Sequence, residues 1–287
     1  MDQRIIKALL QIKSNICFRT LLYPIFTAKS MLTAKHYAKS QDSSRLAEFE
    51  SKFIGKECFI IGNGPSLTIQ DLEKLEGKYT FAANALYTVF DKTTWRPYFY
   101  MCVDIAAIQM HGDKLVTLNV PFLFFDISGK KYIKKQIQGR KNVFFVFQHK
   151  RYKTRKWAFE QPSVSQNAAK KLSLGYTVTF ASIQLAIYMG FQTIYLIGVD
   201  HNYARKIDSK GNVIEKKGVR SYSDIIVDTG LGIQYIDITT AAYQAAKKYA
   251  DQHNIKILDA TRNGQLEVFE KVNFEAVLSN TKKCNDP

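Results

Sequence analysis

Short apolar runs separated by helix-length segments dominate the chain from residue 57 onward. The first run, Glu57-Cys58-Phe59-Ile60-Ile61, ends in a glycine turn and is typical of a strand buried on both faces of a parallel sheet. Similar runs occupy residues 79–83, 98–103, 121–125 and 143–147. The spacing between these runs leaves room for a helix after most of them, so the pattern predicts alternating strands and helices.

Two longer helical segments lie in the second half of the chain. One runs from about Thr179 to Met189, stops at Gly190 and leads into an apolar run over 193–198. The other spans roughly residues 238–253 and precedes the run 256–258. Strands that alternate with helices form βαβ units in an open, mostly parallel sheet. We therefore expect a doubly wound, Rossmann-like α/β domain over residues 51–280, with 281–287 as a tail.

Residues 1–50 differ from this domain because they are basic and partly amphipathic. Apolar residues recur near helical spacing between residues 5 and 12, with basic residues between them, and a polar stretch at 39–44 marks a boundary. We expect an N-terminal helical extension, which either docks on the core or lies on an anionic lipid surface. No apolar run approaches the roughly 18 residues of a spanning helix, and no signal-peptide pattern is present. A cytoplasmic protein, free or peripheral at the inner membrane face, is the expectation.

The cysteine spacing indicates the redox compartment of the protein, and the net charge indicates the class of partner. Cys58 and Cys102 lie inside strand-like runs, which predicts buried free thiols in a reducing compartment. With 41 Lys and Arg against 25 Asp and Glu, the formal charge is +16, so the protein attracts anions. No nucleic-acid-binding motif accompanies the basic residues, so no specific nucleic-acid partner is expected. The remaining candidate partners are phosphorylated small molecules, a polyanionic acceptor and an anionic membrane. The alternative is a basic surface that is solvated and binds no partner.

The glycine turn at residues 62–66 is the first candidate for a binding site. Ligands of open parallel sheets bind beyond the carboxyl ends of the strands, where this turn falls. Gly62 and Gly64 permit close backbone approach to a ligand, while Pro65 and Ser66 suit the opening of a helix whose N–H groups attract phosphate. The turn matches neither the dinucleotide fingerprint nor a Walker loop. A simple strand-to-helix turn is the alternative.

Other polar residues follow further strands or precede a helix. Asn84 comes after the second run, where its amide could pair with a base edge or a ribose, or merely form a turn. Asp104 and Asp200 end two other runs, where carboxylates suit metal, ribose or proton chemistry, with helix N-capping as the alternative. Thr177 stands before the long helix, where a cap is expected in any case.

Three ordered motifs resemble a known superfamily. They are FIIGNGPSL at 59–67, AIYMGFQTIYLIGVD at 186–200 and DATRNGQLEVF at 259–269. Together they resemble the 6-hydroxymethylpterin pyrophosphokinase-like superfamily, whose bacterial members often sit in surface-polysaccharide loci. The first two are also similar to motifs of bacterial lipooligosaccharide sialyltransferases and of motility-associated transferases. The resemblance covers roughly residues 55–278 and implies a nucleotide-handling transferase.

The resemblance also implies roles for individual residues. Asn63 and Asn84 match the two asparagines that hold cytidine monophosphate in the sialyltransferases. Thr177 keeps a hydroxyl among the donor-binding positions before the long helix, and Tyr203 is a shifted equivalent of a tyrosine that contacts the leaving phosphate. The family places its general base, a histidine, between the strand ending at Asp200 and the last long helix.

This chain has no histidine between residues 208 and 250. His201 adjoins Asp200 at the end of a strand and is the candidate general base, with a loop histidine of no catalytic role as the alternative. If His201 is not the base, Asp200, Asp228 and Asp237 are the next candidate proton acceptors.

Three functions remain open on this basis. The first is a glycosyltransferase-like enzyme that uses a nucleotide-activated sugar, with a CMP-sugar as one candidate, to build a cell-surface glycan on a glycan or lipid-linked acceptor. The second is ATP-dependent diphosphoryl transfer to a pterin-like alcohol, in which Asp104 and Asp200 would coordinate Mg²⁺, the one cofactor considered. The third is a non-catalytic nucleotide-binding scaffold of polysaccharide biosynthesis, which the missing histidine favours.

Overall fold

The computed structural model describes residues 28–149, 162–202, 205–207, 213–215, 236–281 and 284. Tyr203, Asp228 and the amphipathic pattern of residues 5–12 lie outside this part of the chain, and so does the side chain of Asp237. The expectations placed on these residues therefore stay predictions.

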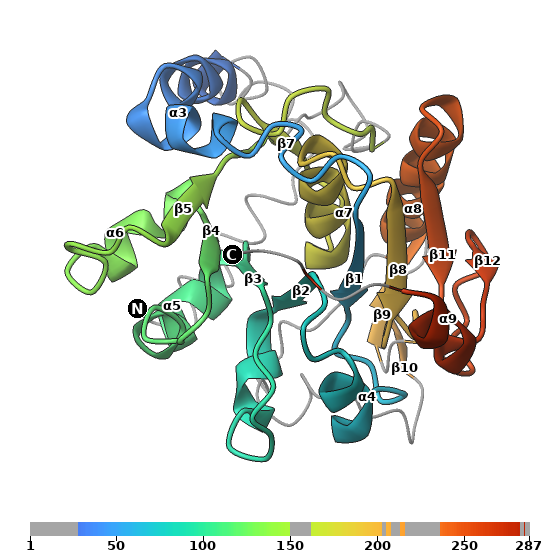
Figure 1. Ribbon diagram of the computed structural model, residues 1–287. Helices are drawn as coiled ribbons and strands as arrows, with labels where there is room; N and C mark the ends of the chain where they lie inside the picture. Colours follow the sequence, from blue (N-terminus) through green and yellow to red (C-terminus); the bar gives the residue numbers. More distant parts are fainter. Residues whose placement is uncertain are drawn as a thin grey trace.

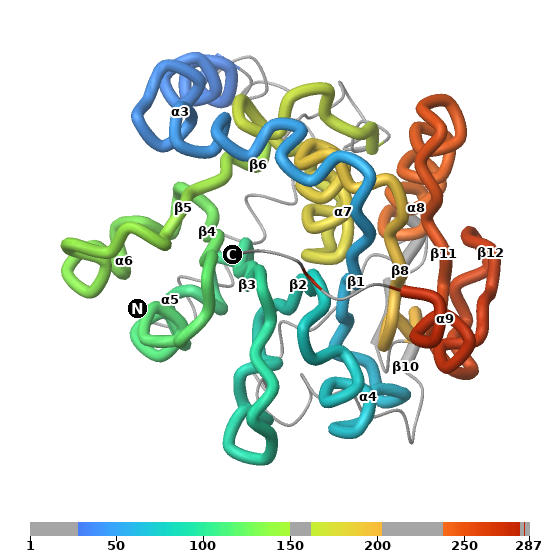
Figure 2. Tube along the Cα trace, in the orientation of Figure 1, coloured from blue at the N-terminus to red at the C-terminus, as the bar shows by residue number. Residues whose placement is uncertain are grey.

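Eight parallel strands form the centre of the fold, in the spatial order β12-β11-β8-β1-β2-β3-β4-β5 (Figures 1 and 2). Their bounds are β1 Glu57–Ile61, β2 Thr80–Ala83, β3 Phe99–Cys102, β4 Phe122–Asp126, β5 Val143–Val146, β8 Thr193–Ile197, β11 Lys256–Asp259 and β12 Glu270–Lys271. The expected open parallel sheet is confirmed. Two small pairs accompany it: parallel β6 Gln148–His149 with β7 Leu172–Ser173, and antiparallel β9 Arg205–Ile207 with β10 Val213–Glu215.

Helices cover both faces of the sheet. A helix over 28–38 precedes α3 Gln41–Ala47, α4 Ile69–Lys74, η1 Asn84–Val89, α5 Ile105–Leu115, η2 Ile127–Gly129, α6 Lys130–Ile133, α7 Val178–Tyr188, α8 Ile236–Gln252 and α9 Phe274–Asn280. Figure 1 shows α3 and α6 at the β5 end of the sheet, and α8 and α9 at the β11–β12 end. Among the described helices, none combines the length and the apolar character that crossing a bilayer requires.

Alternating side chains of each strand feed two separate cores, because successive residues of a strand point to opposite faces. In β1, Cys58 and Ile60 join the core under α7 and α8, whereas Phe59 and Ile61 join the core under α4, α5 and α9. Burial on both faces explains why the strands are apolar at nearly every position. Cys58 and Cys102 are buried free thiols, as expected, and burial raises the pKa of each.

Side chains from the N-terminal helices cover the outer side of β5, the last strand of the described sheet. Tyr37 donates its hydroxyl hydrogen to the carbonyl oxygen of Phe145 at 2.6 Å, and the Arg45 Nη1 donates to the carbonyl of Val143 at 2.9 Å. The Arg45 guanidinium also lies 4.5 Å from the centre of the Phe144 ring. The N-terminal helical extension is therefore tied to the sheet edge by hydrogen bonds and by packing.

Candidate functional site

The candidate site lies where the chain changes direction across the sheet. Strands β1 to β5 run outward in order, after which the chain returns to place β8 on the other side of β1. Ligands of doubly wound sheets bind at such a switch point, beyond the carboxyl ends of the strands. Here that position is surrounded by the turn after β1, the residue after β2 and the segment that leaves β8.

The turn after β1 is packed directly against the segment that leaves β8. The N–H groups of Gly62 and Gly64 donate to the carbonyls of Ile197 and Gly198 at 2.8 and 2.9 Å. A Cβ on Gly62 would lie 2.2 Å from the Gly198 oxygen, and one on Gly64 would lie 1.8 Å from Asp200 Oδ2. Both glycines are thus required for the contact between these two segments of the protein.

Ser66 and Asp200 hold the two segments together through side chains. The Ser66 hydroxyl donates to Asp200 Oδ2 at 2.7 Å, and the backbone N–H of Ser66 donates to the same carboxylate. Burial raises the pKa of Asp200, the hydrogen bonds from Ser66 oppose this, and the nearby Asp259 charge adds to it, with a raised pKa as the result. The Asp200 carbonyl accepts from the N–H of Gln265 at 2.8 Å, which links the motif at 259–269 to the same point.

The expectation that Pro65 and Ser66 open a helix is wrong. Helix α4 begins at Ile69, and its N-cap is Thr68, whose side chain accepts from the N–H of Asp71 while the Asp71 carboxylate accepts from the N–H of Thr68. The amides of Gly62, Gly64 and Ser66 already have acceptors within the protein, so they are not directed at a phosphate. A tertiary contact explains this difference, because the end of β8 and the segment that leaves it supply those acceptors.

Asn63 and Asn84 carry the clearest sign of a missing partner. The Asn63 Nδ2 donates to the carbonyl of Ala83 at 3.2 Å, which turns its Oδ1 the other way. Among the described residues, neither Asn63 Oδ1 nor Asn84 Oδ1 has a hydrogen-bond partner, although both atoms are buried. Nearly all buried polar atoms in proteins are paired, so two such oxygens at the ends of adjacent strands indicate a ligand or ordered water.

Three residues around this edge have left-handed backbone conformations that non-glycine residues rarely adopt. The φ angles of Asn84, Tyr176 and His201 are 52°, 55° and 51°. Asparagine tolerates this region well, whereas tyrosine and histidine adopt it less readily. Strained backbone tends to gather at functional sites, and these three residues follow β2, precede α7 and follow β8.

Tyr243 of α8 contacts both Thr177 and His201. Thr177 is the N-cap of α7 and accepts from the N–H of Thr179 at 3.3 Å, as the capping alternative predicts. Tyr243 forms side-chain hydrogen bonds with Thr177 and Thr179, and its ring lies edge-on to the His201 ring with 5.7 Å between centres.

His201 itself is 8% exposed, and its Nε2 lies 2.9 Å from the Thr240 hydroxyl of α8. It lines a cavity of about 770 Å³ between α8 and residues 265–268, together with Gln244, Lys248 and Gln265. The structure therefore places the candidate base against α8, whereas Asn63 contacts the end of β2. Asp200, next to His201 in the chain and bonded to Ser66, is the connection between these two parts of the site.

Asp104 lies at the start of helix α5. It is exposed, and its Oδ1 accepts from the N–H groups of Ala106 and Ala107 at 2.8 and 3.4 Å as the N-cap of α5. The capping alternative is correct, because an aspartate before a helix satisfies amides that have no other acceptor. Within the ranges that the structure describes, no three His, Cys, Asp or Glu residues gather in a group that could hold a metal ion.

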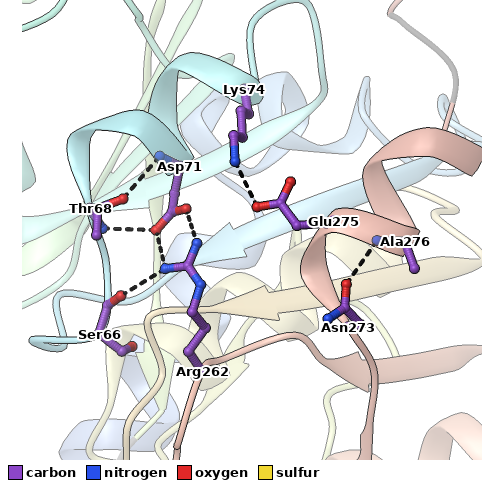
Figure 3. Close-up of polar contacts among 8 residues, drawn as sticks. All are labelled: Ser66, Thr68, Asp71, Lys74, Arg262, Asn273, Glu275 and Ala276. Atoms are coloured by element: carbon purple, nitrogen blue, oxygen red, sulfur yellow. Dashed lines mark hydrogen bonds and ion pairs between the residues drawn. The ribbon is translucent and has the colours of Figure 1, made fainter.

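The sequence analysis missed an ion pair beneath the glycine turn (Figure 3). The Arg262 guanidinium donates to both carboxylate oxygens of Asp71, with Nη1 to Oδ2 at 2.8 Å, and also to the Ser66 carbonyl at 3.3 Å. Burial raises the pKa of Asp71, but hydrogen bonds from Arg262 and Thr68 outweigh it and leave the pKa lowered. The Thr-x-x-Asp spacing of the capping box was visible in the sequence; the pairing with Arg262 was not.

The family model described as 6-hydroxymethylpterin diphosphokinase MptE-like matches residues 32–206. No curated protein matches the chain. A solved structure of the sialyltransferase CstII from Campylobacter jejuni, in complex with a substrate analogue, cytidine-5'-monophosphate, is 15% identical. The match covers 76% of this chain and 85% of that chain, with a TM-score of 0.48.

Proposed function

The chain belongs to the 6-hydroxymethylpterin diphosphokinase MptE-like family, and from this premise we propose that it is a nucleotide-dependent transferase. Asn63 and Asn84 form its nucleoside subsite. The observation that carries the proposal is the pair of buried side-chain oxygens without partners at the ends of β1 and β2.

The chemistry of these oxygens selects the part of the nucleotide that they bind. An amide oxygen only accepts hydrogen bonds, so its ligand must donate. An ionised phosphate has no hydrogen to donate, whereas ribose hydroxyls and the exocyclic amines of cytosine and adenine do. Asn63 and Asn84 therefore bind the ribose or the base, and the phosphates lie elsewhere in the site.

Glycosyl transfer from a nucleotide-activated sugar, with a CMP-sugar as the first candidate donor, is the reaction that we favour. A hydroxyl of a glycan or lipid-linked acceptor attacks the anomeric carbon, the bond from that carbon to the nucleotide phosphate breaks, and a base takes the hydroxyl proton. His201 lines a cavity large enough for a sugar acceptor, and its contact with Thr240 fixes the ring. Histidine side chains commonly act as general bases in proton transfers of this kind.

Diphosphoryl transfer from ATP is the second candidate, because the family's description names a diphosphokinase. This reaction requires Mg²⁺ to neutralise the transferring phosphates. The two carboxylates considered for that ion already accept hydrogen bonds from the protein in this structure. Asp104 caps α5, and Asp200 is bonded to Ser66. A scaffold that binds nucleotide without catalysis is the third candidate.

A thermal-shift screen tests the nucleoside subsite. Wild-type protein is heated with CMP, CDP, UDP, GDP or ATP, each in EDTA and in Mg²⁺. A ligand at 100 times its dissociation constant stabilises the folded state by about 2.7 kcal/mol. For a chain of this size, that corresponds to a rise in Tm of roughly 4–5 °C. Asn63→Ala and Asn84→Ala should lose the shift, while Asn280→Ala, at the exposed end of α9, should keep it.

The pattern of shifts separates the candidates. A response to cytidine nucleotides in EDTA supports glycosyl transfer, and a response to ATP alone that needs Mg²⁺ supports diphosphoryl transfer. If no nucleotide shifts Tm, or if the Asn63 and Asn84 variants respond like wild type, the nucleoside subsite is refuted. Where turnover is found, His201→Asn should reduce it by about 10²–10⁴-fold with unchanged nucleotide affinity. Binding without turnover supports the scaffold.

A further inference from the structure

Half of the net charge of the protein is concentrated in two short segments. Residues 28–48 and 130–141 together contain ten basic and two acidic residues, which gives a net charge of +8, against +16 for the whole chain. The segment 130–141 contains no acidic residue. A charge density of this kind creates a local positive potential well above the average for the surface.

The two segments are joined at one end of the sheet. Lys130 of α6 donates to Asp42 of α3 at 2.6 Å, and its Nζ lies 4.6 Å from the centre of the Phe145 ring of β5. Figure 1 shows the α3 and α6 labels at the β5 end, away from β11 and β12. We call the exposed part of these two segments the basic edge surface. Its lysines are Lys29, Lys35, Lys39, Lys131, Lys134, Lys135 and Lys141.

These seven lysines are exposed, and within the described residues none of them forms an ion pair. By contrast, Asp42, an acidic side chain at the junction, is already paired with Lys130. The basic edge surface therefore presents ammonium groups that form no ion pair with any residue in the described part of the chain.

Apolar side chains are exposed among these lysines. The helix over 28–38 turns Ser30, Ala34 and Tyr37 inward and leaves its two largest aliphatic side chains outside: Met31 is 52% exposed and Leu32 is 60% exposed. Leu32 also lines a shallow hollow of about 580 Å³ along this helix. A surface that combines cations with exposed apolar side chains fits the interface of an anionic bilayer. A purely ionic partner would not be stabilised by contact with Met31 and Leu32.

We propose that the basic edge surface docks the protein on an anionic lipid bilayer. The lysine ammonium groups contact lipid phosphates, and Met31 and Leu32 enter the headgroup region. Four strand spacings separate β5 from β1, which amounts to roughly 19 Å, so docking at the β5 end leaves the carboxyl edge of β1 and β8 open to a soluble ligand.

Vesicle flotation with the full chain tests the ionic part of this proposal. Wild-type protein should bind vesicles of phosphatidylcholine and phosphatidylglycerol, and should bind neutral phosphatidylcholine vesicles far less. Each lysine near an anionic surface contributes about fivefold to the partition coefficient. Lys134→Glu/Lys135→Glu removes two lysines and adds two negative charges, so it should lose at least about 30-fold. The matched control is Lys248→Glu/Lys256→Glu, in α8 and β11 at the other end of the sheet, which changes the net charge equally and should bind nearly as wild type does.

A second double variant tests the apolar part and separates a bilayer from a soluble polyanion. Met31→Ser/Leu32→Ser keeps every charge, so it should weaken vesicle binding while leaving retention on immobilised heparin unchanged. If this variant floats like wild type while the Lys134 and Lys135 variant does not, the surface binds polyanions and the lipid assignment is overturned. Equal binding by the Lys134 and Lys135 variant and its matched control overturns the docking surface altogether. All substituted side chains are exposed, and circular dichroism verifies that each variant is folded.

Discussion

Replacing Arg262 with alanine should destabilise the protein more than replacing Asp71 with asparagine, although both changes remove the same ion pair. The two partners differ in exposure: the Asp71 side chain is 1% exposed and the Arg262 side chain 43%. Without Arg262, a buried carboxylate loses its counter-charge. Without Asp71, a guanidinium that already contacts solvent merely becomes better hydrated.

The expected magnitudes follow from this asymmetry. Breaking a fully buried pair by removing one partner costs about 3–5 kcal/mol. Asp71 keeps its hydrogen bond from the Thr68 amide and Arg262 was half exposed, so we expect Arg262→Ala to cost about 2 kcal/mol. Asp71→Asn retains an acceptor for Thr68 and should cost about 1 kcal/mol, the net value of a typical hydrogen bond. The exposed pair Lys74–Glu275, which also joins α4 to the C-terminal segment, is the control, and Lys74→Ala should cost less than 1 kcal/mol.

Urea unfolding, followed by tryptophan fluorescence and circular dichroism, measures these differences in the free energy of unfolding. The double variant Asp71→Asn/Arg262→Ala completes a thermodynamic cycle and isolates the coupling between the two side chains. Equal costs for the two single variants, or a cost for Arg262→Ala no larger than that for Lys74→Ala, would refute the reasoning.

The same pair predicts a pH dependence with a definite sign. The pKa of Asp71 is lowered in the folded protein, so its stabilising effect is present above the unfolded value of about 3.9. This effect is lost as the pH falls through the lower folded value. The difference in stability between wild type and Arg262→Ala should therefore be full at pH 7 and should shrink below about pH 3.9. A difference that grows on acidification would contradict the assignment.

The remaining predictions concern the glycine turn and the thiols. Gly64→Ala would bring a Cβ to 1.8 Å from Asp200 Oδ2 and 2.7 Å from the Gly198 carbonyl. It should lower the free energy of unfolding by about 1–3 kcal/mol, as overpacking does, and Asp200→Ala in the same chain should restore part of this loss. No recovery would mean that the backbone contact sets the cost. Cys58 and Cys102 should react slowly with iodoacetamide in the folded protein and rapidly in urea, because burial raises their thiol pKa values. Rapid reaction at these positions without urea would show that the sheet opens readily.

The strands of the sheet could be predicted because their environment makes them apolar on both faces. Val143 to Val146 is buried at every position, and so is Phe99 to Cys102, which leaves little ambiguity about their type. The predicted helix from Thr179 to Met189 is confirmed as α7, Val178–Tyr188. Its N-cap and its Gly190 terminator are local signals that need no tertiary context.

The site was harder to predict because its contacts join distant segments. The residues next to Gly62 and Gly64 in the sequence give no sign that the amides of these glycines face carbonyls more than 130 residues away, at the end of β8 and just after it. Likewise, the pairing of Asp71 with Arg262 spans 191 residues, and only the fold brings the two together. The sequence around Asp104 is compatible with a helix cap and with a ligand contact, and the structure shows that Asp104 caps α5.

The hydrogen bonds from Tyr37 and Arg45 to β5 have a consequence for self-association. An open strand edge is a template on which a second chain can add its own strand. The carbonyls of Val143 and Phe145 already accept hydrogen bonds from side chains of the same molecule, so a strand of a second chain cannot pair with them. Shortened forms of the protein that begin after residue 47 would lose both side chains. Such forms would join edge to edge into dimers or larger aggregates, even with the proposed nucleotide site intact.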